Sequence, residues 1–550
     1  MKQLFAYFIL CFSIGAYGAE GAIASPERHA RDAAVQVLAQ GGNAVDAAIT
    51  TAFVLAVTYP EAGNIGGGGF MTLWFDGQPY FLDYREVAPA QAHRDLYLDE
   101  DGDVVAEAST VGHLAVGVPG SVAGLWAAHQ RFGSRPWPEL VAPAIALARD
   151  GFQPEPQLLA RQQQALKHFA GRTNFADYFS PMHADQRFVQ TELAQTLQRI
   201  AEQGRAGFYQ GTTAKLLAEQ MKAQGGLISQ ADLSDYRVKW RTPLQHSWQE
   251  MTLISAPPPS SGGFALAQLL SLKHRRQADF ADHPIDSAAY VHLVAEIEKR
   301  VFADRAEYLG DPDFTQVPLE QLLAKDYLAR RAAEIDPSQI SPTQGIEPGL
   351  ESPQTTHFSV VDQWGNAVSN TTTLNLNFGS GVVVAGAGFL LNNEMDDFSA
   401  KPGVPNAFGV IGGDANAIAP GKRMLSSMSP SLLLRDDKVE MVIGTPGGST
   451  IFTSVFQVLA NVYDAGMPLP QAVAAPRFHH QLWPRDEIRL EPYGTLPQAT
   501  QQALQQQGYR LRQQSWDLGD IQAIQRNGTS WSAVSDPRGR GASAVVSSQP

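Results

Sequence analysis

A threonine that follows a proline- and glycine-rich stretch is the residue of this chain best suited to covalent chemistry. The segment Gln354–Asp362 reads Gln-Thr-Thr-His-Phe-Ser-Val-Val-Asp, and residues 336–354 before it form a connector with four prolines and two glycines. If the bond between Gln354 and Thr355 is cut, Thr355 carries both a hydroxyl nucleophile and a free amine that can serve as its general base. The sequence therefore suggests a precursor with an N-terminal threonine nucleophile.

The residues after the connector predict a β-hairpin that brings a second threonine beside the first. Two alternating runs, Thr355 to Val361 and Ala367 to Asn375, flank a short glycine-containing turn. If Val361 pairs with Ala367, Thr355 lies directly opposite Thr373, with about 5 Å between their Cβ atoms. The alternative interpretation is a threonine-rich face of an ordinary hairpin that points to solvent.

Three later motifs could complete a site for a charged substrate. Asn392–Phe398 contains three acids within four residues, and Ser426-Ser427 precedes an apolar strand expected at residues 431–434. Gly447-Gly448 lies between an expected strand at 441–443 and an apolar helix that begins near Thr450. Backbone N–H groups at such a position can form an anion or oxyanion pocket. Each motif also has a purely structural interpretation: a solvated acidic turn, a serine cap and a tight turn.

A glycine cluster at Gly63–Phe70 invites comparison with a phosphate-binding loop. It lies between an alanine-rich helix that ends near Pro60 and a strand expected at 71–75, and it lacks the Gly-Lys-Ser/Thr sequence of a P-loop. This order is the reverse of the phosphate-binding arrangement. We therefore interpret the glycines as a place where backbones pack closely. A second strand is expected at residues 80–83, and Arg85 lies just after its end.

The composition and the N-terminus limit the class of protein. The chain has 550 residues and a net charge of −14 without a Lys/Arg-rich run, which argues against a nucleic-acid partner. Residues 1–19 combine Lys2, a short apolar run and small residues, as in a secretory signal cleaved after Gly18 or Ala19. The run is too short for a membrane anchor. We expect a periplasmic or secreted protein.

The remaining features concern cysteine, histidine and the middle of the chain. The only cysteine, Cys11, lies in the signal, so the mature chain would contain neither disulfides nor thiolate sites. His357 and the pair His479-His480 lack metal-ligand spacing, so we expect no metal and no cofactor. Residues 118–330 read as mostly helical, with an amphipathic helix at 289–308. A glycosylation sequon at Asn370 lies inside the predicted hairpin and is discounted.

Seven motifs in one order resemble the gamma-glutamyltransferase (glutathione hydrolase) family of N-terminal-nucleophile hydrolases. The resemblance covers about residues 21–538. The motifs are Gly63–Phe70, Asp83–Glu86, Pro257–Gly263, Gln354–His357, Asn392–Phe398, Leu425–Pro430 and Pro446–Ser449.

The resemblance implies an α+β fold, a four-layer αββα sandwich built from two chains of one precursor. Cleavage between Gln354 and Thr355 would separate a large subunit, residues 20–354, from a small subunit, residues 355–550. Residues 401–416 resemble a lid over the pocket. This lid has Phe408 where some bacterial members have Tyr, and we expect a weaker gate and a changed balance of hydrolysis against transfer.

The resemblance also assigns roles within the expected site. Thr355 would be the nucleophile, Thr373 would orient it, and Gly447 and Gly448 would bind the oxyanion. The substrate's α-carboxylate and α-ammonium would be held by two groups of residues. These are Arg85, Ser426 and Ser427 for the carboxylate, and Asn375, Glu394 and Asp397 for the ammonium.

The implied reaction transfers the γ-glutamyl group of glutathione or related compounds to water or to an amino acid or peptide. One alternative is an acylase for glutaryl (cephalosporin) side chains or a poly-γ-glutamate hydrolase. A glutaryl group has no ammonium, so Glu394 and Asp397 would lack a purpose. A second alternative is an exported binding protein that has lost the chemistry, although binding alone requires no nucleophile.

Overall fold

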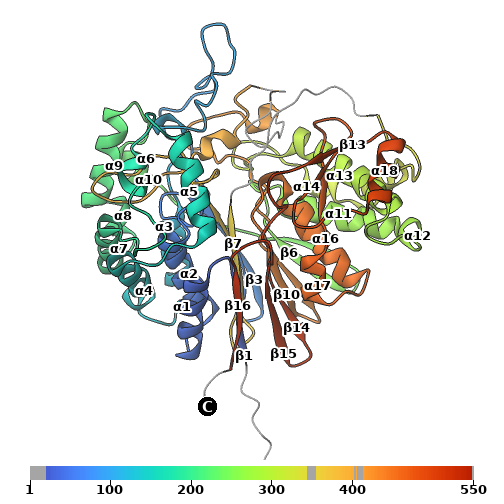
Figure 1. Cartoon of the computed structure of the whole chain (residues 1–550), viewed down its shortest axis with the longest axis horizontal. Coiled ribbons are helices and arrows are strands. Elements are labelled where there is room, and N and C mark those ends of the chain that lie inside the picture. The colour runs from blue at the N-terminus through green and yellow to red at the C-terminus, as the bar shows by residue number, and fades with distance from the viewer. Residues whose placement is uncertain (1–19, 343–354, 402–403, 405–412, 548–550) are drawn as a thin grey trace, which may run out of the picture.

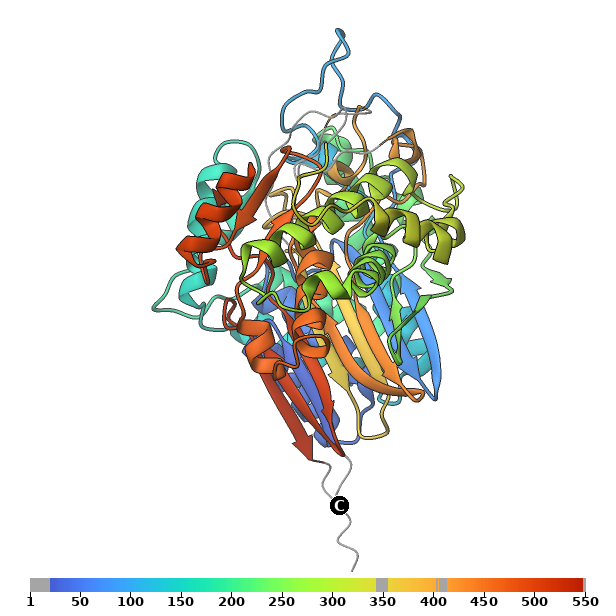
Figure 2. The ribbon, with the colours of Figure 1, turned by 90° about the vertical axis from the view of Figure 1, so that its right-hand side faces the viewer.

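Two β-sheets face each other between two layers of helices. The computed structural model describes residues 20–342, 355–401, 404 and 413–547. One group of helices covers the outer face of the first sheet and a second group covers the outer face of the second (Figure 1). Figure 2, turned by 90°, shows the second group lying in front of the strands. The αββα sandwich predicted from the family resemblance is therefore present.

The first sheet has seven strands in the order β16-β1-β7-β8-β2-β3-β4. All its neighbouring strands are antiparallel. The strands are β1 (Glu20–Ser25), β2 (Gly68–Phe75), β3 (Gln78–Asp83), β4 (Lys239–Arg241), β7 (Thr356–Val361), β8 (Ala367–Thr373) and β16 (Ala542–Ser547). Strands from before and after the predicted cleavage point are therefore interleaved within one sheet.

The second sheet has six strands in the order β15-β14-β10-β9-β6-β5, and a smaller one has the order β11-β12-β13. The strands of the six-stranded sheet are β5 (Leu244–Trp248), β6 (Met251–Ser255), β9 (Ser431–Arg435), β10 (Lys438–Gly444), β14 (Gln522–Asn527) and β15 (Ser530–Ser535). Those of the smaller sheet are β11 (Phe478–His480), β12 (Glu487–Leu490) and β13 (Arg510–Gln513).

The helices divide by sequence between the two outer layers (Figure 1). Those on the first sheet are α1 (Arg28–Ala39), α2 (Ala44–Thr58), α3 (Ser121–Phe132), α4 (Trp137–Asp150), α5 (Pro156–His168), α6 (Phe175–Phe179), α7 (Thr191–Gln203), α8 (Ala206–Tyr209), α9 (Gly211–Ala223) and α10 (Gln230–Asp235). Those on the other side are α11 (Gly262–Arg275), α12 (Gln277–Phe280), α13 (Ala288–Tyr308), α14 (Leu319–Leu322), α15 (Lys325–Ala333), α16 (Ile451–Tyr463), α17 (Leu469–Ala474) and α18 (Gln498–Gln507). Among the described residues, none of these helices has the length and apolar character needed to span a membrane.

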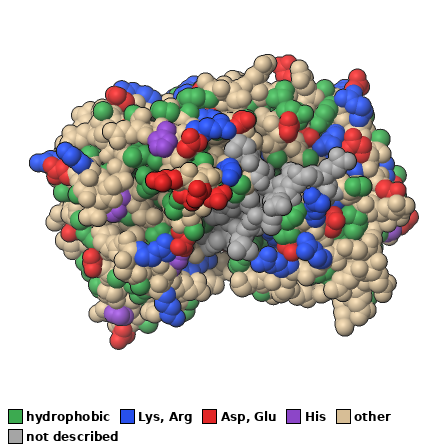
Figure 3. All heavy atoms as spheres, turned by 90° about the horizontal axis from the view of Figure 1, so that it is seen from above, with side chains coloured by type: hydrophobic (Ala, Val, Ile, Leu, Met, Phe, Trp, Pro, Cys, Tyr) green, Lys and Arg blue, Asp and Glu red, His purple; other side chains and the backbone are tan. Residues whose placement is uncertain are grey.

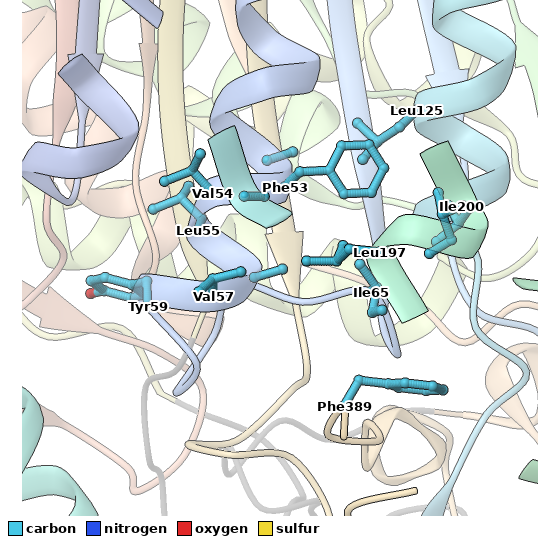
Figure 4. Packing of buried hydrophobic residues seen from close by; sticks show 14 of the residues in the cluster. Phe53, Val54, Leu55, Val57, Tyr59, Ile65, Leu125, Leu197, Ile200 and Phe389 are labelled. Carbon is cyan, nitrogen blue, oxygen red and sulfur yellow. The ribbon is translucent and has the colours of Figure 1, made fainter. Parts of the chain in front are cut away.

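The apolar core forms separate layers, one under each group of helices and a thinner one between the sheets. Helix α2 is buried along its whole length, because its alanines allow neighbouring helices and β7 to approach closely. In Figure 4, Phe53 of α2, Leu125 of α3 and Leu197 of α7 meet in this first layer. The layer between the sheets also contains hydroxyl side chains, and those of Thr72, Ser359 and Ser369 in the first sheet donate to backbone carbonyl oxygens of Pro430, Gln522 and Ile443 in or beside the second.

The structure confirms the predicted hairpin register and corrects three other expectations. Val361 pairs with Ala367, and His357 pairs with Thr371. Both strands are buried throughout, so the alternative of a solvent-facing surface is wrong. Residues 118–330 are mostly helical, as expected, but residues 239–255 within them form three strands that were not predicted. Helix α13 is buried on nearly all sides and is not amphipathic, because its charged side chains make internal ion pairs.

The glycine cluster before β2 is a place of close backbone contact, as predicted. A Cβ atom added to Gly66 would lie 2.1 Å from the carbonyl oxygen of Leu390, and one added to Gly67 would lie 2.1 Å from that of Thr373. These positions therefore admit only glycine. Through them, the segment before β2 fits directly against the end of β8, where the candidate site begins.

Candidate active site

One pocket gathers all the predicted catalytic and substrate-binding residues except Gly447, which is adjacent to one of the lining residues. Its lining consists of Arg85, Arg305, Thr355, Thr373, Asn375, Glu394, Asp397, Ser426, Ser427, Met428, Gly448, Ser449 and Ile451. These residues come from both sides of the predicted cleavage point and from both sheets. The predicted cleavage residue Gln354 and the lid residue Phe408 lie outside the described residues.

The nucleophile candidate lies where the hairpin opens into the pocket. Thr355 immediately precedes β7, and the observed register places it opposite Thr373, the last residue of β8. Thr373 Oγ1 accepts a hydrogen bond from the backbone N–H of Asn375 at 2.8 Å. Asn375 has φ of 76°, and its side-chain amide donates to the carbonyl oxygen of Asn393 at 3.0 Å. This tight turn points the amide side chain of Asn375 toward the acidic motif.

A fully buried arginine is the centre of the charged part of the pocket. Arg85 follows β3 and forms ion pairs through separate guanidinium nitrogens with Glu394 and Asp397, which belong to one 3-10 turn (Glu394–Asp397). Its remaining donors reach the carbonyl oxygens of Met424 and Leu425, both at 3.4 Å. The groups assigned to opposite ends of the substrate therefore pair with each other in this structure.

The electrostatics of this cluster follow from its burial. Burial opposes the charged form of Arg85, but the Glu394 and Asp397 carboxylates outweigh burial and raise the pKa of Arg85. Burial raises the pKa of Asp397, and the nearby Arg85 acts in the opposite direction. Burial likewise raises the pKa of Glu394, against the effect of Arg85, so Arg85 stays charged and both acids need a close cation to be ionised.

A third carboxyl group lies behind Arg85 and was not predicted as part of the site. Glu86 is completely buried, with one oxygen 3.7 Å from Arg85 Nη1. Neither of its oxygens has a hydrogen-bond partner among the described residues. Burial raises the pKa of Glu86 to about 7, although the charge of Arg85 acts in the opposite direction. A buried carboxylate without a hydrogen-bond donor is costly, which favours its protonated form.

The two glycines expected to bind an oxyanion form the turn between β10 and α16. Gly447 has φ of 139° and Gly448 has φ of 56°, conformations that favour glycine. A short 3-10 turn, Gly448–Thr450, leads into α16. Ser449 supports the turn by donating to Gln481 Oε1 at 2.9 Å. The turn thus places backbone N–H groups at a helix N-terminus beside Thr355.

The serine pair is held by the Pro257–Gly263 motif. Both the backbone N–H and the hydroxyl of Ser261 donate to the carbonyl oxygen of Ser426 at 2.8 Å. Ser260 Oγ donates to the carbonyl oxygen of Met428 at 2.5 Å. These bonds join the start of α11 to the segment before β9 and fix the direction of Ser427 in the pocket.

Sequence analysis missed Arg305, a second buried arginine in the pocket. It lies on α13 and donates from Nε to Ser261 Oγ at 2.9 Å and from Nη2 to Ser427 Oγ at 3.2 Å. Burial lowers the pKa of Arg305 to about 10, and Asp397 partly offsets this effect. The sequence did contain a signal for buried charge, because several charged residues lie among many apolar ones in this helix. The sequence did not indicate which of these residues reaches the pocket.

The histidines considered as metal ligands are buried and hydrogen-bonded. Burial lowers the pKa of His357 and His479 to about 3 and that of His480 to about 4, so all three are neutral. No group of three potential ligands was found within the described part of the chain. Asn370, the sequon residue, is buried and accepts a hydrogen bond from the Tyr84 hydroxyl at 2.7 Å.

Charged side chains also lie on the surface of the protein, outside the pocket. On the face seen from above, acidic and basic side chains of the described residues are interspersed among polar and apolar ones (Figure 3). The described part of this face is therefore neither uniformly basic nor uniformly acidic, and the strong charge pairing lies inside the pocket around Arg85.

Two facing antiparallel sheets between helix layers, with a threonine at the start of a central strand, define the fold of N-terminal-nucleophile hydrolases. The structure aligns with a cephalosporin acylase from Bacillus halodurans at a TM-score of 0.84 and 27% identity, covering 99% of each chain. It also aligns with gamma-glutamyltranspeptidase from Pseudomonas nitroreducens at a TM-score of 0.57 and 56% identity, covering 58% of this chain and 95% of that one.

The sequence comparisons identify the family within this class. The family model for gamma-glutamyltranspeptidase matches residues 30–546. The chain is 60% identical to a glutathione hydrolase proenzyme from Pseudomonas aeruginosa, covering 96% of this chain and 94% of the relative. It is 45% identical to the one from Escherichia coli, covering 86% and 83%. The chain belongs to the gamma-glutamyltranspeptidase family, and the predicted enzyme class, that of a two-subunit γ-glutamyl hydrolase/transpeptidase proenzyme, is confirmed.

Proposed function

We propose that Thr355 is the nucleophile of this enzyme and that its donor substrates are glutathione and related γ-glutamyl compounds. The single observation that carries the proposal is the pocket itself. It places a threonine that would become N-terminal after cleavage next to a buried arginine, one buried and one partly exposed acid, and a glycine turn. The γ-glutamyl group passes first to Thr355 and then to water or to an amino acid or peptide.

The charge pattern of the pocket supports recognition of a zwitterionic γ-glutamyl head group. The α-carboxylate binds Arg85 through the planar guanidinium and accepts hydrogen bonds from Ser426 and Ser427. The α-ammonium replaces Arg85 as a partner of Glu394 and Asp397, and the side-chain carbonyl of Asn375 accepts its remaining proton. Since the ligand adds one charge of each sign, its binding leaves the net charge of the buried cluster unchanged.

The reaction proceeds by nucleophilic acyl transfer. Thr355 Oγ1 attacks the γ-carbonyl carbon while the Thr355 α-amine, with an ordinary pKa of about 7.7–8.0, accepts the hydroxyl proton. Gly447 and Gly448 donate N–H bonds to the oxyanion, and one well-placed donor contributes about 3–4 kcal/mol to the stability of the transition state. The proton passes to the departing amine, which leaves an ester on Thr355. Water or an acceptor amine then attacks this ester.

The α-amine does not exist before the bond between Gln354 and Thr355 is cut, so the precursor is inactive in transfer. We propose that Thr355 itself makes this cut and produces the large chain, residues 20–354, and the small chain, residues 355–550. The interleaved strands of the first sheet hold the two chains together after cleavage. Residues 1–19 direct export to the periplasm or the medium.

A glutaryl acylase is the competing function on this fold. The chain is 36% identical to the Acylase ACY 1 proenzyme of a Pseudomonas species and shares its fold with a cephalosporin acylase. A glutaryl group has no ammonium, so its binding would leave Glu394 and Asp397 without a cation from the substrate. The two acids that pair with Arg85 therefore favour a γ-glutamyl substrate.

The test combines intact mass with donor preference. Thr355→Ala is compared with Thr356→Ala, a matched control because Thr356 is buried beside it and its hydroxyl has no hydrogen-bond partner among the described residues. We expect two chains and glutathione hydrolysis in the wild type and in Thr356→Ala, and one uncut, inactive chain in Thr355→Ala. Self-cleavage in Thr355→Ala refutes the nucleophile assignment. Preference for glutaryl over γ-glutamyl p-nitroanilide refutes the substrate assignment.

A further inference from the structure

We propose that His357 is a positioning residue that sets the distance between the Thr355 nucleophile and the oxyanion turn at Gly447–Gly448. The inference rests on the proposed function of Thr355. His357 is completely buried and does not line the pocket, and the mechanism assigns it no step. It lies two residues from Thr355 along the chain.

The nucleophile and the oxyanion turn belong to different sheets. Thr355 immediately precedes β7 of the first sheet, whereas the turn follows β10 of the second. No backbone ladder joins β7 to β10, so their separation depends on the side chains packed between the sheets. Acyl transfer requires the attacking hydroxyl and the oxyanion donors to converge on one carbonyl group. A side chain that controls this spacing therefore controls the geometry of the reaction.

Three consecutive hydrogen bonds lead from β8 through His357 to the second sheet. Ser359 Oγ donates its proton to the carbonyl oxygen of Gln522 on β14 at 2.9 Å, so it can only accept from His357 Nε2, at 3.1 Å. His357 Nδ1 consequently accepts from Thr371 Oγ1 at 2.8 Å. Every donor in this series has one acceptor, which fixes the tautomer and the orientation of the imidazole ring.

The same ring lies against the base of the oxyanion turn. A Cβ atom added to Gly444 would lie 2.3, 2.5 and 2.7 Å from Cε1, Nδ1 and Nε2 of His357. Gly444 ends β10, pairs with Gln522 and stands three residues before Gly447. Its backbone does not have the positive φ that favours glycine, so the absent side chain serves only to make room for the ring. The imidazole is therefore a spacer between β7 and β10.

The chemistry of His357 indicates a role in shape and not in proton transfer. Burial lowers its pKa to about 3, and both ring nitrogens are engaged in the fixed series of hydrogen bonds. A neutral ring that exchanges no proton keeps the same shape across the working pH range. Substitution of His357 should therefore lower kcat across the pH range and leave the midpoint of the acid limb of the pH–rate profile unchanged.

The test uses the spatial fit between His357 and Gly444. We expect His357→Ala and Gly444→Ala each to lower kcat about 10- to 100-fold with KM within about twofold, since a misplacement of about 1 Å can cost about 100-fold in rate. In the double variant the new methyl group occupies space vacated by the ring. Its kcat should therefore exceed the value expected from multiplying the two single effects.

The control is Thr72→Val, which removes another hydrogen bond between the sheets, from Thr72 Oγ1 to the carbonyl oxygen of Pro430 at 2.8 Å. Thr72 does not line the pocket, so the melting temperature should fall while kcat is unchanged. Ser359→Ala keeps the ring but removes the last two bonds of the series, the one from His357 Nε2 and the one to the carbonyl oxygen of Gln522. It provides a milder variant, with an expected loss in kcat of several fold, if His357→Ala does not fold.

Several outcomes would overturn the inference. One is a kcat within twofold of wild type in both His357→Ala and Ser359→Ala. Another is a double variant whose loss in kcat equals the product of the two single losses. A third is a shift of the acid limb of the pH–rate profile in His357→Ala. An equal loss of kcat in Thr72→Val would reduce His357 to a general structural residue. Failure of the proposed function looks different, because the wild type would then lack γ-glutamyl transfer or Thr355→Ala would retain it.

Discussion

Replacing Glu86 by glutamine should stabilise the protein at alkaline pH and leave its stability nearly unchanged in acid. Glu86 lies behind Arg85, is fully buried, and has no hydrogen-bond partner for either oxygen among the described residues. Burial raises its pKa to about 7. Glutamine has nearly the same shape and cannot ionise, so the variant isolates the cost of carrying a charge at this position.

The sign and the size follow from proton linkage. The folded state holds the Glu86 proton more tightly than the unfolded state, so the wild type loses stability as the pH rises from about 4.5 to about 7. The difference of about 2.5 pKa units corresponds to about 3 kcal/mol above pH 7. For a chain of 550 residues, this amounts to about 3 °C in melting temperature.

The assay is thermal unfolding of the wild type and Glu86→Gln at pH 5 and pH 8. We expect the variant to melt about 3 °C higher at pH 8 and within about 1 °C of wild type at pH 5. The control is Glu250→Gln, whose side chain is 87% exposed and should give no difference at either pH. Equal melting temperatures of Glu86→Gln and wild type at pH 8, or a variant less stable there, would show that Glu86 is ionised and satisfied in the folded protein.

Three further predictions address the pocket and its surroundings. Arg85→Lys replaces the planar guanidinium by a point charge and removes one or more charged hydrogen bonds to the substrate, so KM for a γ-glutamyl donor should rise about 10- to 100-fold. Steady-state kinetics at a fixed acceptor concentration measure this KM, and an unchanged value would contradict the carboxylate assignment. Gly447→Ala places a Cβ atom 2.5 Å from Thr450 Oγ1 in a residue with φ of 139°. Because the oxyanion donors shift, kcat should fall about 100-fold while KM changes little. A change in KM alone would argue against the oxyanion role. Gly66→Ala places a Cβ 2.1 Å from the Leu390 carbonyl oxygen, so little folded protein should accumulate in the soluble fraction, and normal yield would refute the close packing.

Much of the hairpin was predictable because its contacts are local. A period of two residues and a short turn define the β7–β8 register, so Thr355 and Thr373 could be placed opposite each other from the sequence alone. The glycines before β2 were likewise interpretable, since a run of glycines between a helix and a strand favours close backbone contact. Family motifs then named most of the other pocket residues, though not Arg305, without giving their arrangement.

The burial of charge was not predictable to the same degree. Helix α13 carries Glu296, Lys299 and Arg300 on faces that a sequence pattern assigns to solvent, but they pair with one another inside the protein. The strands at 239–255 are short, so local propensity gave no reliable signal. β5 and β6 pair with each other, but β4 and β6 also pair with β3 and β9, which lie far away in the chain. Signal residues 1–19 and the cleavage residue Gln354 remain sequence predictions.

The sequence by itself determined the family, the candidate nucleophile and the pairing of its strand, because these depend on neighbouring residues and on motifs in a fixed order. Only the tertiary structure decided that Arg85 pairs with Glu394 and Asp397, more than 300 residues later, and that Arg305 joins them. The physical reason is that such contacts arise from how two sheets and their covering helices pack. No periodicity within one segment specifies which buried charges will meet across that packing.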